Sequence, residues 1–533
     1  RQRQMCIRDR SIIGASVLQK GTTNGTITDF EGGFILNNVP SDATIEISFV
    51  GYKTQTIPVN GRSTFNIVLK EDNEILDEVV VIGYGVQKKA DLTGSVANVN
   101  ADKLNTQSNA NIGQALQGKI AGVDIVSQGG LPGQGTRIMV RGIGTLNNAS
   151  PLYIVDGMYM TSIDHINPAD IESIDVLKDA SSAAIYGSRA ANGVVIVTTK
   201  SGLNTEGAPI IDFSANLGVN MPSKYLDLLN AEEWASVTTK SREAAGLPPL
   251  EMAQDLANKE DNDWQDIMFR NALTTSHQIS ISGGTEATTY MASISHLRED
   301  GVMENTGLKR TNIALNITQV LNKWLTVGMG TQAIQKEFGG EQPYLEAGLK
   351  MSPYGIYKDE NDRYVDYPMD QTLFYNPMAN IDATNDKTNR NVFISTFAEI
   401  QFPIDGLSFR TNFGYNYRNN FVGSYYGRNT LSGKKVNGSA SIENIHYYDY
   451  TWENLLKYNK TFGLHKIDAT ALFSMQETTK KEAKESGESF VNDDSEYHNM
   501  AGAEKNKEIT SKLTETAMLS YICLLYTSDA ADD

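Results

Sequence analysis

The chain has 533 residues, enough for three or four domains of about 150 residues, and its 46 Lys and Arg against 64 Asp and Glu give a formal charge of −18. This acidic balance argues against a nucleic-acid binder, which needs a net basic face. The two cysteines, Cys6 and Cys523, lie at opposite ends, which excludes a disulfide scaffold, a cysteine-ligated zinc site and an iron–sulfur protein. No run of about 18 apolar residues is present, but the strands of a membrane β-barrel would leave a weaker, alternating signal.

Residues 11–70 are rich in turn signals, with short alternating segments between them. Ile45, Ile47 and Phe49 alternate with polar residues, so they would share one face of a strand. This pattern predicts a small antiparallel β-sandwich of about seven short strands. The region contains no His and no Cys, and nothing in it is typical of catalysis.

Residues 71–90 form a charged linker that runs into an apolar stretch. Asp77 and Glu78 precede the β-branched run Val79–Ile82, which favours a strand but has no obvious sheet to join. This segment would be either an edge strand of the neighbouring domain or a strand that adds itself to the edge of a partner's sheet.

Residues 91–202 mix helical and strand patterns and predict a mixed α/β globule. We expect a short helix over Ile112–Gly118 and another over Ala180–Tyr186 that ends at Gly187. Strand patterns cover Val123–Val126, Arg137–Val140, Leu152–Val155, Ile171–Leu177 and Val194–Thr198.

Two arginines in this α/β region flank an apolar strand. Arg137 and Arg141 lie on either side of Ile138–Val140, so burial of both in an apolar core is not expected. We expect them to pair with carboxylates of the strands around them, and direct contact with a ligand is the less favoured alternative.

Residues 203–521 carry long alternating segments. Phe409, Phe413 and Tyr415, for example, alternate with polar residues, and both faces persist over about ten residues. That is the length of a tilted strand that crosses a bilayer, whereas strands of soluble sandwiches are nearer five or six residues. The pattern predicts roughly ten such strands.

Long polar loops separate these strands. They cover residues 220–270, 336–390 and 477–510. Asn230, followed by Glu232 and Glu233, predicts a helix N-cap with an acidic first turn inside the first loop. Short turns at one end of the strands and long loops at the other are typical of a membrane barrel.

Two phosphate-binding motifs are nearly present and are interpreted as turns. Gly83 and Gly85 begin a dinucleotide fingerprint, but Lys88 occupies the third glycine position. Gly130–Arg137 is close to a phosphate loop, but Thr136 stands where the lysine should be. The six histidines form no H-E-x-x-H pair, and no G-x-S-x-G elbow is present. The sequence therefore predicts no enzyme, no metal site and no cofactor.

Motifs along nearly the whole chain resemble one family. Gly14–Val17 and Gly21–Asp29 resemble a carboxypeptidase-regulatory-like sandwich. Asp77–Val81 resembles a TonB box. Pro151–Gly157 and Ile185–Gly193 are similar to the plug of SusC/RagA-type TonB-linked outer-membrane transporters.

The resemblance implies a mainly β fold. It would consist of an N-terminal carboxypeptidase-regulatory-like β-sandwich, an α/β plug domain and the first part of a large transmembrane antiparallel β-barrel. The plug would fill the lumen, as in the plugged 22-stranded transporters.

The resemblance also implies a function and partners. A large nutrient, an oligosaccharide or a peptide, would bind under a SusD-like surface lipoprotein at the outer membrane of a Gram-negative cell, with the barrel in contact with outer-membrane lipid. The TonB–ExbB–ExbD inner-membrane complex would then pair with the TonB box and pull on it. The residues that the resemblance assigns to this box are Asp77, Glu78, Val79, Val80 and Val81.

We expect the following domain bounds: 11–70 for the sandwich with its first strand missing, 71–90 for the linker with the TonB box, 91–202 for the plug and 203–521 for a partial barrel. Residues 1–10 and 522–533 interrupt the family pattern and are interpreted as non-native junctions of a fragment truncated at both ends. Such a partial barrel would not close or transport by itself.

Two alternatives belong to other functional classes. A surface adhesin or structural protein built from β-sandwiches would have short strands and no plug sequence. An enzyme related to the carboxypeptidases would share only their accessory module, and it would need a zinc-ligand pattern that this sequence does not contain.

Overall fold

The computed structural model describes most of the chain. From residue 96 to 529 it covers all but 101–111, 146–147, 250–260, 370–373 and 464. Before residue 96 it covers 6–7, 10–11, 15–20, 22, 24–29, 32–49, 52–65, 67, 69, 79–82 and 85–88. The chain forms two compact units: Arg1–Val80 with Val86–Leu92, and Val81–Gly85 with Thr93–Asp533.

The first unit contains a small antiparallel sheet. Its strands are ordered β4-β3-β5-β6, with bounds β3 Ser16–Gln19, β4 Gly25–Ile27, β5 Thr44–Phe49 and β6 Tyr52–Pro58. Ile45 and Ile47 are buried on one face, as the alternation predicts. A separate pair joins β1 (Cys6–Ile7) to β2 (Arg10–Ser11). The sequence predicted about seven strands. Among the described residues the sheet has four, and residues 34–41 form no strand.

The second unit begins with an α/β domain. Its five-stranded sheet has the order β13-β12-β15-β14-β9, with β9 Val96–Asn100, β12 Leu152–Val155, β13 Met158–Met160, β14 Ile171–Leu177 and β15 Val194–Thr199. A separate antiparallel pair joins β10 (Val123–Ser127) to β11 (Thr136–Val140). The helices are α2 Ile112–Leu116, η2 Pro168–Asp170, α3 Ala180–Ala183 and η3 Ala184–Asn192.

All five strands predicted in this domain are present within one or two residues. The predicted end of the second helix is only partly right. The chain breaks from helical geometry at Gly187, whose φ is 62°, but it resumes as a 3-10 turn and continues to Asn192. Glycine suits this position because its missing Cβ permits positive φ.

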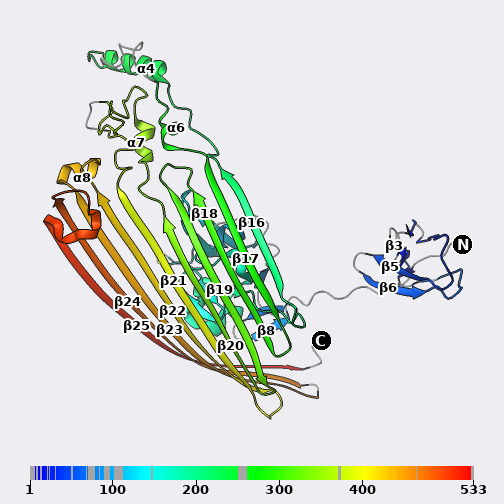
Figure 1. Cartoon of the computed structure of the whole chain (residues 1–533). Helices are drawn as coiled ribbons and strands as arrows, with labels where there is room; N and C mark the ends of the chain where they lie inside the picture. Colours follow the sequence, from blue (N-terminus) through cyan, green and yellow to red (C-terminus); the bar gives the residue numbers. More distant parts are fainter. Residues whose placement is uncertain are drawn as a thin grey trace. The chain divides into compact units, whose positions relative to one another are not determined.

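The second unit continues as one large antiparallel sheet of ten strands in chain order (Figure 1). Their bounds are β16 Ile210–Asn220, β17 Ala272–Gly284, β18 Thr288–Asp300, β19 Gly307–Asn322, β20 Leu325–Phe338, β21 Thr384–Gln401, β22 Leu407–Tyr426, β23 Ser439–Phe462, β24 His465–Phe490 and β25 Ala503–Asp529. The expected number of strands is confirmed, and their lengths, 11 to 27 residues, exceed the expected ten.

Turns at the two ends of this sheet differ in length. Residues 285–287 and 323–324 are short turns, whereas 221–271 and 339–383 are long segments at the opposite end. That end, called the loop end below, carries α4 (Ala231–Ala244), α6 (Trp264–Met268), α7 (Leu345–Lys350) and α8 (Leu431–Val436) (Figure 1). The 3-10 segment η5 (Glu496–Gly502) precedes β25. In the described part of the chain, none of the helices is both long and apolar enough to cross a membrane.

The predicted helix start at Asn230 is confirmed. The Asn230 side chain accepts a hydrogen bond from the Glu233 amide at 3.0 Å, and the Glu233 carboxylate accepts one from the Asn230 amide at 3.2 Å. This reciprocal capping box satisfies two amides that the first turn of a helix leaves unpaired.

The predicted loop 477–510 is wrong over most of its length. Residues 477–490 continue β24, and β25 begins at Ala503, so only 491–502 connect the strands. The segment 477–490 is polar on both faces and lacks the apolar alternation that identifies a half-buried strand. Its backbone nevertheless pairs with β23, from Glu477 opposite Tyr450 to Glu488 opposite Ser439.

The ten-stranded sheet is inverted in polarity relative to a soluble sheet. Ile294 and Ile313 are 48% and 50% exposed on one face, while Ser293 and Asn312 are buried on the other. The buried polar face contacts the α/β domain, and the apolar face is open. This alternation is typical of strands that face lipid on one side and a polar lumen on the other.

The α/β domain approaches the sheet closely at Gly414 of β22. A Cβ placed there would lie 1.8 Å from the Met158 sulfur, and Met158 is buried in the core of the α/β domain. Only a glycine permits this contact, because real Cβ atoms do not come so near to another side chain.

We therefore predict that Gly414→Val displaces β12 and β13 from their position against the ten-stranded sheet. Overpacking of this kind costs about 1–3 kcal/mol. Hydrogen–deuterium exchange, followed by mass spectrometry, should show roughly tenfold faster exchange of the β12 and β13 amides. Gly218→Val on β16 is the control, because a Cβ at Gly218 meets nothing within 4 Å. Equal exchange in the two variants would contradict the close contact.

Candidate functional site

The predicted partner-binding segment is a strand where the structure describes it. Val79–Ile82 forms β7, which pairs with β8 (Gly85–Lys88) in a two-stranded sheet of its own. Asp77 and Glu78 lie outside the described residues. The strand-forming tendency expected for Val79, Val80 and Val81 is therefore met, and their role in binding a partner stays a prediction.

The two arginines singled out in the sequence are exposed. Arg137 lies in β11 opposite Val126, and Arg141 follows β11 with a φ of 58°. In the described part of the chain, neither guanidinium forms an ion pair or a hydrogen bond with the ten-stranded sheet. Pairing of Arg137 and Arg141 with the sheet thus stays a prediction, and other residues make the contacts that the structure shows.

The 3-10 turn η2 anchors the α/β domain to β17 and β18. Asp170 is 4% exposed, and its carboxylate accepts hydrogen bonds from Ser293 Oγ at 2.7 Å and Gln278 Nε2 at 3.1 Å. Asn167 caps the turn and donates to Gln278 Oε1 and Ser295 Oγ. Burial raises the pKa of Asp170 above its ordinary value, while the hydrogen bond from Ser293 opposes this shift. This buried polar network fixes η2 against the polar face of the sheet.

A second anchor lies at the end of β15. The Asp156 carboxylate accepts hydrogen bonds from the Thr199 amide at 2.9 Å and from its hydroxyl at 2.7 Å. Asn316 of β19 donates to Thr199 Oγ1 at 3.2 Å and to the Lys200 carbonyl at 2.5 Å. Burial raises the pKa of Asp156, and the hydrogen bonds from Thr199 act against that rise. The α/β domain is thus joined to β19 through one amide side chain.

A third anchor uses an arginine at the far side of the domain. Arg189 donates to Gln476 Oε1 of β24 at 2.6 Å, and its guanidinium lies 4.0 Å from the centre of the Tyr159 ring. Such cation–π contacts orient the guanidinium as well as stabilising it. Together the three anchors tie the α/β domain to strands from β17 to β24.

A polar cavity of about 230 Å³ lies between the α/β domain and strands β20, β21 and β22. Lys336 Nζ donates to the Asp164 carbonyl at 2.7 Å, and Arg418 Nη1 donates to Thr161 Oγ1 at 2.7 Å. His165 lines the same cavity. Its pKa is lowered to about 3, first by burial and then by the charges of Lys336, Arg418 and Arg310. The cavity is therefore lined by a neutral imidazole together with cationic residues and the Asp164 carboxylate.

Sequence analysis missed all of these anchoring residues. Asp170, Arg189, Lys336 and Arg418 contact partners that are 108 to 287 residues away in the chain. The available signal was the polar half of each alternating strand, which identifies a lumen-facing position but not its partner.

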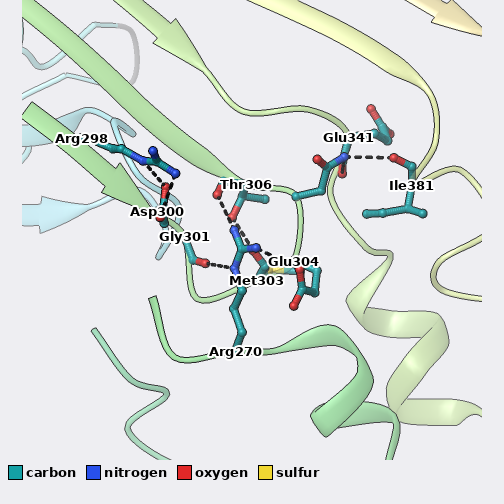
Figure 2. Close-up of polar contacts among 10 residues, drawn as sticks. Arg270, Arg298, Asp300, Gly301, Met303, Glu304, Thr306, Glu341 and Ile381 are labelled. Atoms are coloured by element: carbon teal, nitrogen blue, oxygen red, sulfur yellow. Dashed lines mark hydrogen bonds and ion pairs between the residues drawn. The ribbon is translucent and has the colours of Figure 1, made fainter. Parts of the chain in front are cut away.

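At the loop end, the Arg270 side chain forms hydrogen bonds with the turn of residues 301–306 (Figure 2). Arg270 donates to the Gly301 carbonyl at 3.1 Å, to Glu304 Oε2 at 3.0 Å and to the Thr306 carbonyl at 3.3 Å. Asn305, with a φ of 60°, donates to the carbonyls of Glu341 and Ile381. This rim clamp, Arg270 with turn 301–306, joins three connections at the loop end.

An apolar cluster of α6 and the long connections lies beside the rim clamp. Trp264 donates from its indole nitrogen to the Ser352 carbonyl at 2.9 Å. The buried members of the cluster are Trp264, Met268, Met351, Met369 and Met378. The loop end is thus a packed layer rather than a set of independent loops.

No group of three or more His, Cys, Asp or Glu side chains within the described ranges could hold a metal ion.

Two family models match the chain. The TonB-dependent receptor plug domain matches residues 88–194, and the CarboxypepD_reg-like domain matches residues 7–81. Three curated proteins illustrate the relatives. TonB-dependent receptor P39 of Formosa agariphila is 34% identical over 87% of this chain and 45% of its own length. TonB-dependent receptor P3 of the same organism is 33% identical over 95% and 50%. TonB-dependent receptor SusC of Bacteroides thetaiotaomicron is 31% identical over 96% and 53%.

Solved structures give the same picture. The RagAB peptide importer in its open-open state matches with a TM-score of 0.76 and 25% identity, over 85% of this chain and 55% of that chain. The ferric citrate transporter FecA shares the fold, with a TM-score of 0.52 and 11% identity over 82% and 54%. The chain spans about half the length of the curated relatives that it matches.

We predict that Arg270→Gln loosens the rim clamp. The change removes hydrogen bonds from a charged donor, each contributing about 1.5–3 kcal/mol, so the amides of residues 301–306 should exchange at least tenfold faster. Arg298→Gln is the matched control, because the Arg298 guanidinium bonds only to Asp300 on its own strand in the part of the chain described. Unchanged exchange in Arg270→Gln would show that the turn holds itself.

His165 should stay neutral down to pH values near 3. The ordinary pKa of histidine is about 6.5, so between pH 6.5 and 3 the imidazole is protonated in the unfolded chain and neutral in the folded chain. The free energy of unfolding therefore decreases as pH falls from about 6.5 toward 3. Exchange of the imidazole C2 hydrogen, measured by mass spectrometry across pH, reports this pKa directly. In Lys336→Gln the pKa should rise, because one of the charges that lowers it is gone. A midpoint near 6.5 in the parent would contradict burial of the ring.

Proposed function

Since the chain belongs to the SusC-like family of TonB-dependent receptors, we propose that it acts in TonB-dependent import of a large nutrient, an oligosaccharide or a peptide, across the outer membrane. The observation that carries this proposal is the plug domain, which is hydrogen-bonded to the polar face of a sheet whose other face is apolar. A plug against a lumen wall is the arrangement that a gated importer needs. It also argues against a surface adhesin.

The apolar face supports a location in the outer membrane. Ile279, Ile313 and Phe413 are 47–50% exposed on it, and such side chains are stable against lipid but not against water. In this setting the ten strands form part of a transmembrane wall, and the loop end faces away from the short turns. The outer-membrane lipid is then a partner of the whole apolar face.

The TonB box supplies the connection to energy. In the proposal, the TonB–ExbB–ExbD complex pairs with residues 77–81 and pulls on the linker. Backbone hydrogen bonds give affinity without a fixed side-chain code, which fits a run of valines. Since β7 already pairs with β8, TonB would add to this two-stranded sheet at its free edge or replace β8.

The polar character of the plug–wall interface fits a domain that must move. Each hydrogen bond contributes only about 0.5–1.5 kcal/mol net when both partners are neutral, and about 1.5–3 kcal/mol when one is charged, as at Arg189. A pull can therefore break the anchors at Asp170, Thr199 and Arg189 one after another. An apolar interface of similar size would resist separation much more strongly.

A SusD-like surface lipoprotein is the proposed partner at the loop end. Support comes from the similarity to the RagAB peptide importer and to SusC. The rim clamp and the apolar cluster provide a rigid layer on which such a protein could rest. The cargo is proposed only as an oligosaccharide or a peptide.

We predict that Val80→Pro abolishes uptake and leaves surface binding intact, because proline lacks the amide that a strand pairing needs. Uptake of labelled nutrient by whole cells that carry the change in the full-length receptor, and binding at 4 °C, separate the two effects. Val80→Ala keeps the amide and should import normally. Normal uptake by Val80→Pro would refute the TonB-box assignment.

A further inference from the structure

The polar cavity between the plug and the wall contains a buried ammonium without a carboxylate at ion-pair distance in the described residues. Lys336 of β20 is 9% exposed, and its one hydrogen bond goes to the Asp164 carbonyl. Buried charges are normally paired, since an isolated charge loses its hydration without compensation. An ammonium has three donors, so two of its N–H groups are left for another acceptor.

The carboxylate that lines this cavity is engaged by neutral donors. Asp164 accepts from Ser162 Oγ at 2.8 Å, and from the Thr136 hydroxyl at 3.3 Å and amide at 3.4 Å. It offsets one of the three cationic residues that line the cavity, Lys336, Arg390 and Arg418. Arg390 is exposed, and Arg418 forms an ion pair with Asp449 at 3.2 Å. The ammonium of Lys336 is buried and has less direct compensation than the guanidinium of Arg418.

Two residues that line the cavity each carry a buried polar atom that has no hydrogen-bond partner among the residues described. These atoms are Nε of Arg418, a donor, and Oδ1 of Asn391, an acceptor. Both are buried, and leaving such atoms unpaired costs about 1–3 kcal/mol each. The cavity thus offers charged donors together with an acceptor, which suits an acidic group that carries a neighbouring hydroxyl or amide.

The volume limits what can enter. At about 230 Å³ the cavity is smaller than the roughly 300–1,000 Å³ of ordinary ligand pockets. It would take one acidic unit of a longer molecule rather than the whole molecule. Its walls are Gly133, Gly135, Ser162 and Asp164 of the plug on one side and strands β20–β22 on the other.

We propose that this cavity binds a carboxylate group of the imported nutrient, with Lys336 as its counter-charge and Arg418 Nε as a further donor. The inference rests on the proposed import function and narrows its cargo to acidic molecules. The carboxylate belongs either to a uronate sugar or to an acidic amino acid, and the experiment separates these sources.

The same two cations hold the plug. Lys336 and Arg418 donate to Asp164 and Thr161, which lie three residues apart on one plug connection. A bound carboxylate would attract the same two side chains through their remaining donors, so occupancy of the cavity would shift them and weaken one attachment between plug and wall. Binding of cargo and readiness of the plug to move are thereby coupled through the two side chains.

The test is calorimetric titration of the purified protein in detergent with two matched pairs of probes. One pair is trigalacturonate and its fully methyl-esterified form, and the other is triglutamate and triglutamine. We expect one acidic member to bind at least tenfold more tightly than its neutral match, and the pair that responds identifies the source. Equal binding within both pairs, or no binding of either acid, would overturn the proposal.

Variants locate the site. Lys336→Gln should weaken binding of the acidic probe about tenfold, the effect expected for one charge-assisted hydrogen bond, and leave the neutral probe unchanged. Lys336→Arg should retain most of the affinity. Lys309→Gln, an exposed lysine on β19, is the control. Parent-like hydrogen–deuterium exchange of the β19, β20 and β21 amides reports whether each variant is folded. Undiminished acid binding by folded Lys336→Gln would overturn the site.

These binding measurements use no TonB, so their outcome does not depend on the outcome of the import test. If Val80→Pro imports normally, the proposed function fails even when acidic probes bind in the cavity. If import depends on Val80 but acidic and neutral probes bind alike, only the cargo inference fails.

Discussion

The inverted polarity of the ten-stranded sheet is the constraint on which the rest of the second unit depends. A sheet with an apolar outer face must place its polar side chains on the inner face, where they are removed from bulk water. Buried polar groups need hydrogen-bond partners, so the plug must present complementary donors and acceptors. Asp170 with Ser293, Thr199 with Asn316 and Arg189 with Gln476 are three such matches. The shape of the plug surface follows from this demand.

A polar interface of this kind is specific without being very strong. Each contact fixes the orientation of the plug, because an unmatched buried donor or acceptor would cost more than the contact gains. The close approach of Met158 to Gly414 and the burial of Phe393 among plug residues add steric complementarity at β21 and β22. The interface therefore defines one position of the plug against the sheet.

Much of the fold could be predicted from sequence because its signals are local. Alternation over many residues identified the strands from β16 to β25, and Asn230 with Glu233 marked the start of α4. The region 477–490 could not be predicted as a strand, since it is polar on both faces and its stability comes from the neighbouring strands. Here backbone pairing overrides side-chain pattern.

The functional contacts were harder to foresee for a related reason. Arg137 and Arg141 attracted attention because they flank an apolar strand, yet both are exposed. Lys336 and Asp164 are in contact although 172 residues separate them in sequence, and no local sequence pattern around either residue predicts the contact. A sequence identifies the face on which a polar residue lies, but a contact between two domains depends on how they dock. The family resemblance supplied the plug and the TonB box, since these are contiguous motifs.

The last strands of the ten-stranded sheet are longer than crossing a bilayer requires. β25 has 27 residues, which at about 3.4 Å per residue is roughly 90 Å of extended chain. A hydrocarbon layer about 25 Å thick, crossed at a tilt of about 45°, accounts for less than half of that length. In the proposed membrane location, the polar stretches of β24 and β25 next to η5 would therefore extend beyond the hydrocarbon layer, where their polar side chains on both faces meet water.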